Sequence, residues 1–438
     1  MNLLYLTFYF EPDLGPGAFR NTALVNELCR QLPEGSHIHV ITTLPNRYQS
    51  YKPRAVEHEE QLNGNCRITI DRVAVPTHNS GQLGQARAFT TYFWAVHRLT
   101  KEGKYASVFA SSSRLFTAYL GAKLARSRHI PLYLDIRDLF REAIGDVYKS
   151  RWYIGHVVQS LLNVPLWFVE QYTFSYARNI NLVSEGFRPH FKAYRQATYS
   201  YFTNGIDEEF LNLVLFPEET FPGSAKPSEV KTILYAGNVG EGQGLHKIIP
   251  QAARQLGAQY RFVVVGGGGA KRKLEAVLQA QRITNVKLYE PVSRSELMAY
   301  YQQADYLFLH LNNLKACRRV LPSKLFEYGA MGKPILAGVT GFAAQFIRAH
   351  LPNTILFESG DVRTLVKQLR RRPYCTEDRV DFNARFRRSA ISQRMAQQIR
   401  QSLVMTLNEP IADGCTKFSD ESDHALFVDK KMANASMK

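Results

Sequence analysis

Short apolar runs rich in β-branched residues alternate with helical stretches along most of the chain, and the alternation restarts once near the middle. The predicted strands of the first half are Leu3–Phe8, His37–Thr42, Ile68–Val73, Ser107–Ala110, Leu132–Ile136 and Ile180–Val183. Those of the second half are Thr232–Tyr235, Arg261–Val265, Val286–Tyr289, Tyr306–His310, Pro334–Ala337 and Ile355–Phe357. This pattern is typical of parallel sheets covered by helices. Because each series opens with a glycine-rich turn, the sequence predicts an α/β protein with two doubly wound, Rossmann-like domains that face each other.

Composition shifts mark the domain limits. The first domain is predicted to span residues 1–198, with helices over Gly17–Gln31, Gln85–Leu99, Leu115–Arg126, Gly155–Tyr176 and Phe187–Arg195. Tyr201–Asp207 is interpreted as a strand with an Asn-Gly turn, and the Pro-rich stretch Phe216–Pro227 as a connection. The second domain is predicted to span residues 199–382. A last helix over 383–408 is expected to cross back, and the polar stretch 409–438 is expected to be mostly disordered.

The composition excludes several classes of protein. The five cysteines are scattered without a C-x-x-C spacing, which favours reduced thiols in a cytosol over disulfides or a zinc site. The N-terminus lacks the basic region of a signal peptide, and no apolar run approaches the roughly 18 residues of a membrane span. No metal and no cofactor are expected. A net charge of +17 predicts anionic partners, although no nucleic-acid-binding signature accompanies it.

The stretch Leu321–Ala337 carries the most chemical information. Ser323 is placed to cap a helix whose first turn holds Lys324, and Gly332 and Pro334 end it. A helix N-terminus with a lysine suits a phosphate, and Glu327, one turn on, is suited to accept hydrogen bonds from sugar hydroxyls. A capped helix with an exposed Lys–Glu pair is the alternative interpretation.

A glycine-rich turn follows the first predicted strand of each domain, and a further one, Val265–Lys271, follows the next predicted strand of the second domain. They place backbone close to a ligand without a side chain between them. None matches G-x-G-x-x-G or a P-loop, so a nicotinamide enzyme is a weak interpretation. The candidate binding residues in these turns are Gly15 and Gly17 in the first domain, and Gly237, Asn238, Gly240 and Gly266 in the second.

Charged residues follow two other predicted elements. Arg137 and Asp138 end a strand, where the carboxylate is placed to accept a proton from an acceptor hydroxyl, or else forms an internal ion pair. Arg318 and Arg319 precede the Lys324 helix and are candidates to compensate the charge of a diphosphate.

Two predicted helices are rich in aromatic residues. One contains Ala88–Arg98 and the other runs from Trp152 past Trp167. Aromatic residues beside arginine and lysine can seat a protein at an anionic membrane surface, although core packing explains most such residues.

The ordered motifs resemble those of the bacterial glycosyltransferase family 4 enzymes of GT-B fold, in the branch that builds O-antigen, capsule and exopolysaccharide. The matching pieces run across roughly residues 1–400. They are the loop Tyr9–Gly17, Asp135–Leu139, Val183–Phe187, Asn204–Asp207, Tyr235–Gly240, Val265–Gly268 and Pro322–Tyr328. The ordered set is more specific than any single piece.

The resemblance implies a retaining, metal-independent glycosyltransferase at the inner face of the plasma membrane. A UDP-linked nucleotide-sugar donor would bind the second domain: Lys324 and the helix N-terminus would hold the diphosphate and Glu327 the ribose. Pro291 and Val292 would border the base, and Ser323 and Tyr328 belong to the same donor motif. A lipid-linked or oligosaccharide acceptor would bind the first domain.

The sequence departs from the family pattern at three places. Arg319 stands where the family has a first glutamate, and Asn238 and Gln243 replace the usual arginine and lysine. The common acceptor-side histidine is absent near Asp138. An epimerase or phosphorylase on the same fold, or a non-catalytic membrane-associated scaffold, therefore stays open beside the expected hexosyl- or N-acetylhexosaminyltransferase.

Overall fold

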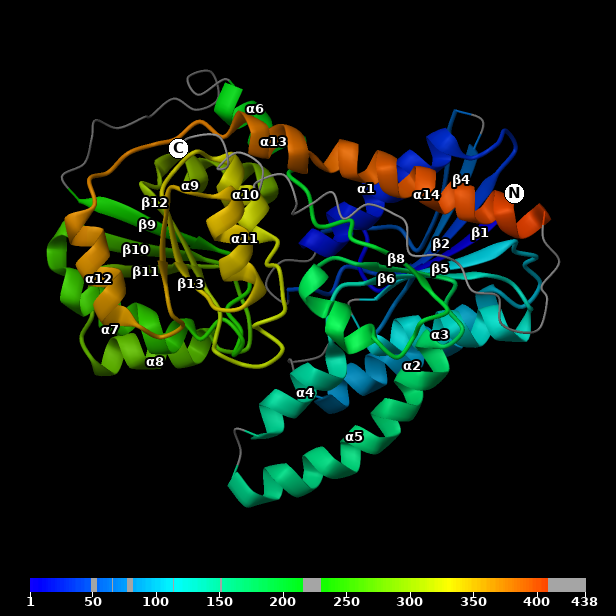
Figure 1. Cartoon of the computed structure of the whole chain (residues 1–438), viewed down its shortest axis with the longest axis horizontal. Coiled ribbons are helices and arrows are strands. Elements are labelled where there is room, and N and C mark those ends of the chain that lie inside the picture. The colour runs from blue at the N-terminus through cyan, green and yellow to red at the C-terminus, as the bar shows by residue number, and fades with distance from the viewer. Residues whose placement is uncertain are drawn as a thin grey trace, which may run out of the picture.

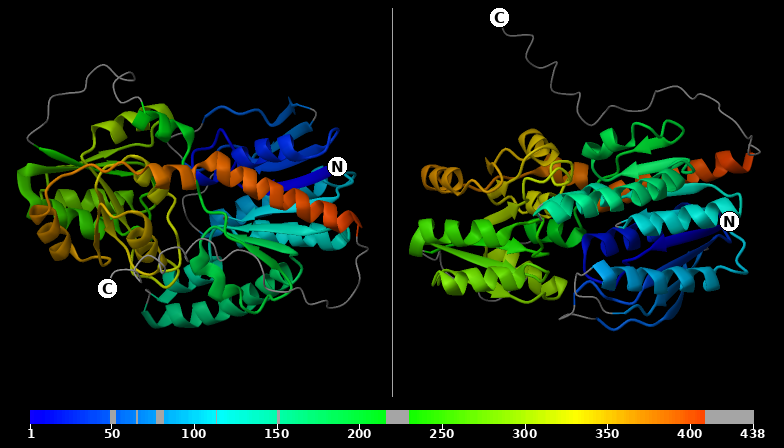
Figure 2. Two further views of the ribbon diagram at one scale, coloured as in Figure 1. Left: turned by 45° about the horizontal axis from the view of Figure 1, so that its top comes forward. Right: turned by 90° about the horizontal axis from the view of Figure 1, so that it is seen from below.

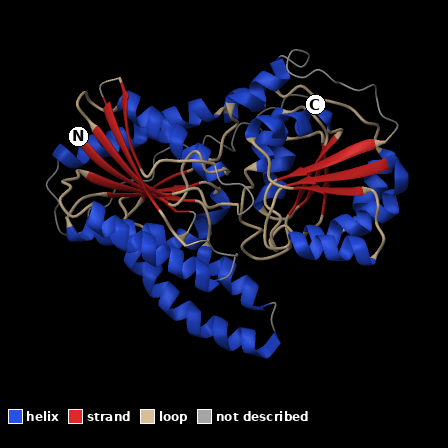
Figure 3. Ribbon diagram, turned by 180° about the vertical axis from the view of Figure 1, so that it is seen from behind, coloured by secondary structure: helices blue, strands red, loops and turns tan. Residues whose placement is uncertain are grey.

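The computed structural model describes residues 1–48, 53–64, 66–76, 82–112, 114–149, 152–215 and 230–408. They form two domains side by side, each a sheet with helices on both faces (Figure 1, Figure 3). The prediction of two doubly wound α/β domains is confirmed. The predicted connection 216–227 and the tail 409–438 lie outside the described residues.

The sheet of the first domain has, within the described ranges, the strand order β3-β4-β2-β1-β5-β6-β7-β8. Neighbouring strands are parallel except β3 and β4, which form an antiparallel hairpin at the edge. The strands are β1 (Asn2–Thr7), β2 (His37–Thr43), β3 (His58–Asn63), β4 (Cys66–Val73), β5 (Ser107–Ser112), β6 (Leu132–Ile136), β7 (Asn179–Leu182) and β8 (Thr198–Ser200). Strand β3 was not predicted because its largely exposed, polar residues give no apolar run.

Two groups of helices cover this sheet. The first face carries α1 (Pro16–Gln31) and α14 (Arg388–Asn408), which pack against each other. The second face carries α2 (Gln82–Leu99), α3 (Leu115–Ser127) and α5 (Trp152–Phe174), with α4 (Phe140–Lys149) paired to α5. The α4–α5 pair projects away from the sheet (Figure 1).

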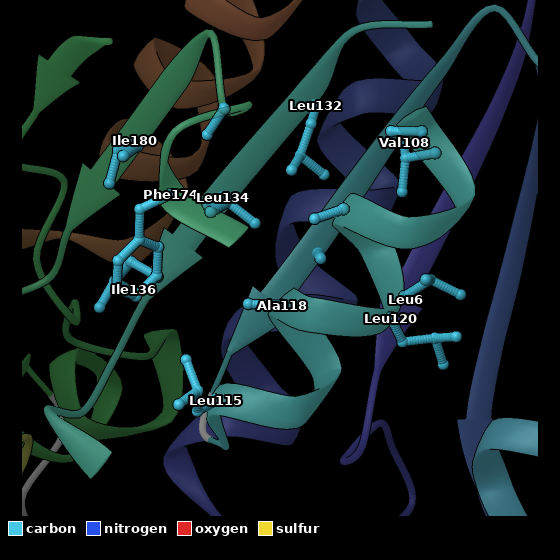
Figure 4. Close-up of a cluster of buried hydrophobic side chains, with 14 of the residues drawn as sticks. Leu6, Val108, Leu115, Ala118, Leu120, Leu132, Leu134, Ile136, Phe174 and Ile180 are labelled. Atoms are coloured by element: carbon cyan, nitrogen blue, oxygen red, sulfur yellow. The ribbon is translucent and has the colours of Figure 1, made fainter. Parts of the chain in front are cut away.

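Strand β1 is buried on both faces, as the central strand of such a sheet must be. Leu4 and Leu6 belong to the core under the second face, whereas Leu3 and Tyr5 belong to the core under α1 and α14. Figure 4 shows the core under the second face, where Leu6 and Val108 from the strands approach Ala118 and Leu120 of α3.

The second sheet has, in the part of the chain that is described, the all-parallel order β11-β10-β9-β12-β13-β14. Its strands are β9 (Lys231–Ala236), β10 (Tyr260–Val265), β11 (Val286–Tyr289), β12 (Tyr306–His310), β13 (Ile335–Gly338) and β14 (Thr354–Phe357). One face carries α7 (Leu245–Leu256), α8 (Lys271–Ala280) and α12 (Val362–Arg371). The other carries α6 (Glu208–Leu215), α9 (Arg294–Gln303), α10 (Lys324–Ala330), α11 (Phe342–His350) and α13 (Val380–Phe386). Two short 3-10 helices, η1 (Glu185–Phe191) and η2 (Gly257–Gln259), complete the described elements.

Two segments of chain cross between the domains next to each other. The main chain of Ile206 exchanges hydrogen bonds of 2.8 Å with Phe386 O and with the Arg388 N–H group. Beyond this crossing, α14 returns along the first domain (Figure 2), where Gln398 Oε1 accepts a hydrogen bond of 2.8 Å from the Tyr133 hydroxyl.

The predicted strand over Tyr201–Asp207 and the predicted helix over Phe187–Arg195 need correction. Residues 201–205 have no regular structure, because this segment pairs with the returning chain at Ile206 and not with a sheet. The helix is the short 3-10 turn η1, which contains Pro189; proline has no N–H group to donate to an α-helical ladder.

Candidate active site

A cavity of about 580 Å³ lies between the two domains. It opens where loops follow the carboxyl ends of β1, β2, β5 and β6 on one side and of β9 and β10 on the other, the usual position of ligand sites in such sheets. Among the described residues, its polar and glycine lining includes Gly15, Gly17, Arg47, Arg114, Arg137 and Asp138 from the first domain, and Gly237, Asn238, Gly266, Arg294, Ser323, Lys324 and Glu327 from the second.

Lys324, the first residue of α10, lies in this cavity. Its Nζ atom is 5.1 Å from the ring centroid of Tyr235, and within the described ranges it has no hydrogen-bond or ion-pair partner. Burial lowers the pKa of the Lys324 ammonium group, although Glu327 opposes this effect. A desolvated cation without a protein partner is a site that an anionic ligand can fill.

The predicted cap of this helix is not formed. Ser323 has helical backbone angles and its side chain makes no capping hydrogen bond. The main-chain carbonyl of Pro322 instead accepts a hydrogen bond of 3.1 Å from the Leu325 N–H group. Ser323 therefore lines the cavity and does not cap the helix.

The two glycine-rich turns of the second domain lie against each other beneath Lys324. The Gly237 N–H group donates to Val265 O over 2.8 Å. A methyl group at Gly237 would collide with Lys324 Nζ, and one at Gly266 would collide with Gly237 O. Both glycines have positive φ angles, +133° and +145°. At each position, therefore, both the close packing and the backbone conformation require glycine.

Asn238 and Gly240 both form hydrogen bonds within their own turn. The Asn238 side-chain amide donates to Gln243 Oε1 over 3.2 Å, and the Gly240 N–H group donates to the same oxygen over 3.0 Å. Asn238 still lines the cavity, whereas Gly240 does not. These bonds hold the turn in shape.

Glu327 lies one helical turn from Lys324. Its Oε2 atom accepts a hydrogen bond of 2.7 Å from the hydroxyl of buried Tyr301, whose pKa is raised well above its usual value by burial and by the Glu327 charge. The tyrosine thereby fixes the orientation of the carboxylate toward the cavity.

Arg137 contributes a cation from the first domain. Burial, together with repulsion from Arg20 and Arg388, lowers its pKa to about 10, although Asp135 opposes the shift. Its Nε atom is buried without a hydrogen-bond partner, and a methyl group at Gly17 would collide with its Nη1 atom. Gly17 therefore leaves room for the guanidinium group beside the N-terminus of α1.

Asp138 faces the cavity next to Arg137. The protein walls of the cavity raise the pKa of its carboxyl group, while Arg137 and Arg47 act in the opposite direction. The alternative interpretation, an internal ion pair between Arg137 and Asp138, does not describe this motif. The buried ion pair at the end of this strand joins Asp135 to Arg20, which donates two hydrogen bonds of 3.0 Å to the carboxylate.

Four predicted site residues lie outside the cavity lining: Gly240, described above, and Tyr328, Arg318 and Arg319. The hydroxyl of Tyr328 is fully buried and donates to Phe308 O over 3.1 Å, so this residue belongs to the core. Arg318 donates to Asn313 Oδ1 over 2.7 Å. Arg319 forms an ion pair of 3.0 Å with Glu142 of the first domain.

The Arg319 pair belongs to a buried network that joins the domains. Glu142 Oε1 also lies 3.2 Å from His190 Nδ1, and His190 Nε2 lies 3.2 Å from Glu170 Oε1. Although burial opposes it, the two carboxylates raise the pKa of His190. Arg319 therefore contacts a neighbouring domain and not the cavity.

Sequence reasoning overlooked three cations in the cavity: Arg47, Arg114 and Arg294. The first two follow β2 and β5 within a few residues, so their position after a strand was a usable signal. Arg294 gave no sequence signal, because its place in the cavity depends on contacts between distant residues. Its guanidinium lies 4.0 Å from the Phe19 ring of the opposite domain and pairs with Asp207. Only the packing of the two domains brings it into the site.

The described residues contain neither a metal-binding cluster nor a membrane-spanning helix. No cluster of three or more His, Cys, Asp or Glu side chains is arranged to hold a metal ion. No helix combines the length and apolar character needed to cross a membrane.

Comparison with known sequences gives a family match over the second domain. Residues 217–388 match the family "Glycosyl transferases group 1". The chain is also 37% identical over 106 residues to the Escherichia coli (strain K12) protein named "Putative colanic acid biosynthesis glycosyl transferase WcaI". That match covers 24% of this chain and 26% of the E. coli protein, so it spans about a quarter of the relative's length.

Comparison with solved structures identifies the fold. Sucrose-phosphate synthase from Thermosynechococcus elongatus superposes with a TM-score of 0.67 at 15% identity, covering 92% of this chain and all (100%) of that one. HepE from Anabaena, solved in complex with UDP-glucose, gives a TM-score of 0.56 at 15% identity, covering 93% and 99%. The two domains therefore form a GT-B fold, as the sequence motifs predicted.

Proposed function

We propose that this chain, a GT-B protein whose second domain is a glycosyl transferases group 1 domain, transfers a sugar from a nucleoside-diphosphate sugar to a lipid-linked or saccharide acceptor in surface polysaccharide biosynthesis. The donor is UDP-linked, the sugar is a hexose or an N-acetylhexosamine, and the anomeric configuration is retained. The match to the E. coli colanic acid protein supports a role in surface polysaccharide biosynthesis, and the UDP-glucose complex of HepE supports a UDP-linked hexose as donor.

The observation that carries the proposal is Lys324, a desolvated cation that has no hydrogen-bond or ion-pair partner in the described part of the chain and faces the interdomain cavity above two glycine-rich turns. Among the charged side chains described in the lining, arginine and lysine are Arg47, Arg114, Arg137, Arg294 and Lys324, whereas the carboxylates are Asp138 and Glu327. This excess of positive charge favours a diphosphate.

In the proposed mechanism, the diphosphate lies against Lys324, and Glu327 holds the ribose. The bond between the anomeric carbon and the diphosphate oxygen breaks as the acceptor hydroxyl attacks from the same side. The acceptor proton passes to the departing diphosphate or to Asp138, a carboxylate in the cavity lining. Lys324 stabilises the charge that develops on the leaving group, an effect worth about 3–4 kcal/mol for one well-placed donor.

Arg318 and Arg319 were expected to share this role. Since both have protein partners outside the cavity, the proposal assigns the main electrostatic contribution to Lys324. Arg137 is assigned to the acceptor side, beside Asp138 and the start of α1.

The test is a thermal-shift screen of the purified protein against a panel of nucleotide sugars, because a bound ligand raises the melting temperature by mass action. We expect one or more UDP-sugars to raise it and UDP to be released when an acceptor is added. Product analysis with donor alone separates an epimerase, and NMR of the product's anomeric proton tests retention. Absence of any nucleotide-sugar effect would refute the proposal.

A further inference from the structure

An exposed apolar stripe runs along α5. Leu161, Val164, Phe168 and Tyr172 are spaced by three, four and four residues, so they lie on one face of the helix. All four are exposed, and Leu161 and Phe168 keep 69% and 61% of their surface in contact with solvent. A face of large apolar side chains on a projecting helix is rarely left without a partner (Figure 1).

Helix α2 presents a second stripe on the same side of the first domain. Trp94 is 66% exposed, and Arg87 and Arg98 lie on the same helical face, seven residues before it and four residues after it. Both arginines are exposed as well. An indole ring flanked by cations suits the boundary between lipid headgroups and acyl chains.

Helix α3 joins the two stripes with cations. Lys123 Nζ lies 5.2 Å from the ring centroid of Phe93 in α2, and the Arg126 guanidinium lies 4.6 Å from that of Tyr172 in α5. The three helices cover one face of the sheet, so the aromatic and cationic side chains form a continuous surface, which we call the α2–α3–α5 face (Trp94, Lys123, Arg126, Phe168 and Tyr172).

The charge of this face has one sign. The sequences of α2 and α3 contain no aspartate or glutamate, and α5 contains a single one, Glu170. Glu170 is 2% exposed and is paired with Arg141 over 2.6 Å. The face thus offers apolar and cationic groups without an exposed carboxylate, which is complementary to an anionic lipid surface.

An aromatic path connects this face to the cavity. Phe140 lines the cavity and lies 5.7 Å from Phe116, which lies 5.2 Å from Phe89. Phe89 in turn contacts Phe93, the neighbour of Trp94. Four successive ring contacts therefore link the lining of the candidate site to Trp94 on the proposed lipid-facing surface.

We propose that the α2–α3–α5 face binds the surface of an anionic lipid bilayer, with Trp94 and the α5 stripe entering the headgroup boundary and Lys123, Arg126 and the α2 arginines contacting lipid phosphates. This deepens the proposed function, because it brings the cavity to the membrane that holds a lipid-linked acceptor. The binding itself does not require sugar transfer.

The experiment is co-sedimentation of the full chain with phosphatidylcholine vesicles that contain or lack phosphatidylglycerol. We expect binding only to the anionic vesicles, and weaker binding as salt increases. The double variant Trp94→Glu/Phe168→Glu should bind about tenfold more weakly or worse, and Lys123→Gln about fivefold more weakly, the loss expected for one cation near a charged surface.

Matched controls lie elsewhere on the chain. Leu62 on β3 is 80% exposed and Lys287 on β11 is exposed, so Leu62→Glu and Lys287→Gln should leave vesicle binding unchanged. Thermal unfolding with and without the UDP-sugar found above verifies that every variant folds and binds donor, which separates this proposal from the transfer reaction. Equal binding by the double variant and the wild type, equal loss in the controls, or burial of the face in a homodimer seen by light scattering would overturn it.

Discussion

The contrast between two partly buried lysines of the second domain gives the sharpest prediction. Lys324 lies at the start of α10 with no hydrogen-bond or ion-pair partner among the described residues, whereas Lys333 Nζ donates to the carbonyls of Tyr301, Gln302 and Ala304 over 2.8, 2.5 and 2.5 Å. Lys333 therefore caps the C-terminus of α9, and its pKa is nevertheless lowered to about 8 by burial. The two lysines share a domain and a chemical group but not a role.

Replacing Lys324 by methionine keeps the length of the side chain and removes the charge. We expect kcat to fall by about 10²–10³-fold, which corresponds to about 2.7–4 kcal/mol of lost stabilisation of the leaving diphosphate. Because the ammonium group is desolvated and unpaired in the free protein, we also expect the variant to be as stable as the wild type or more stable, by up to about 2 kcal/mol.

Lys333→Met should do the opposite. Three carbonyls at the end of α9 lose a charged donor, so stability should fall by about 2–3 kcal/mol, while kcat of the folded protein stays close to that of the wild type. Urea unfolding and a UDP-release assay on the same preparations measure both effects. If Lys324→Met keeps its activity, or loses both stability and activity as a structural lysine would, the electrostatic argument is refuted.

Three further predictions rest on other parts of the structure. Gly266→Ala places a methyl group against the Gly237 carbonyl at φ +145° and should cost about 1–3 kcal/mol of stability, whereas Gly242→Ala, with no atom near its added methyl group, should be neutral in the same urea titration. Glu327→Gln should weaken donor binding by about tenfold or more in a titration calorimeter while leaving the fold intact, because the amide oxygen still accepts from Tyr301; unchanged affinity would remove Glu327 from the ribose site. His190 has a raised pKa in the folded protein, so it contributes stability that is fully present below the unfolded pKa of about 6.5 and is lost as the pH rises through the folded value. Melting temperatures of His190→Gln across that window should lack this decrease, and a decrease as large as in the wild type would exclude the histidine.

Much of the architecture follows from local sequence alone. The strand Leu132–Ile136 is a short run that is apolar except for Asp135 and is buried throughout, which is typical of an interior strand of a parallel sheet. The glycine-rich turns were recognisable for a similar reason, since Gly237 and Gly266 adopt backbone angles that other residues avoid. The edge strand β3 was not predicted, because its polar residues show no periodic pattern of hydrophobicity.

The misassigned site residues share a different cause. Arg319 and Tyr328 stand within a few residues of Lys324 in the sequence, yet one contacts Glu142 of the other domain and the other bonds to the main chain of β12. Conversely, Arg294 and Phe19 are far apart in the sequence and meet across the cavity. Nearness along the chain does not fix the direction of a long side chain.

The sequence by itself determined the two doubly wound halves, the glycine turns at their first strands, and the presence of a lysine and a glutamate one helical turn apart. Such features depend on periodicity and backbone conformation, which neighbouring residues control. Tertiary structure decided which cations have protein partners and which face the cavity, and it left the aromatic side chains of α2 and α5 on a surface. Those outcomes depend on how the two sheets and their covering helices pack, and packing is set by contacts between residues that the sequence keeps far apart.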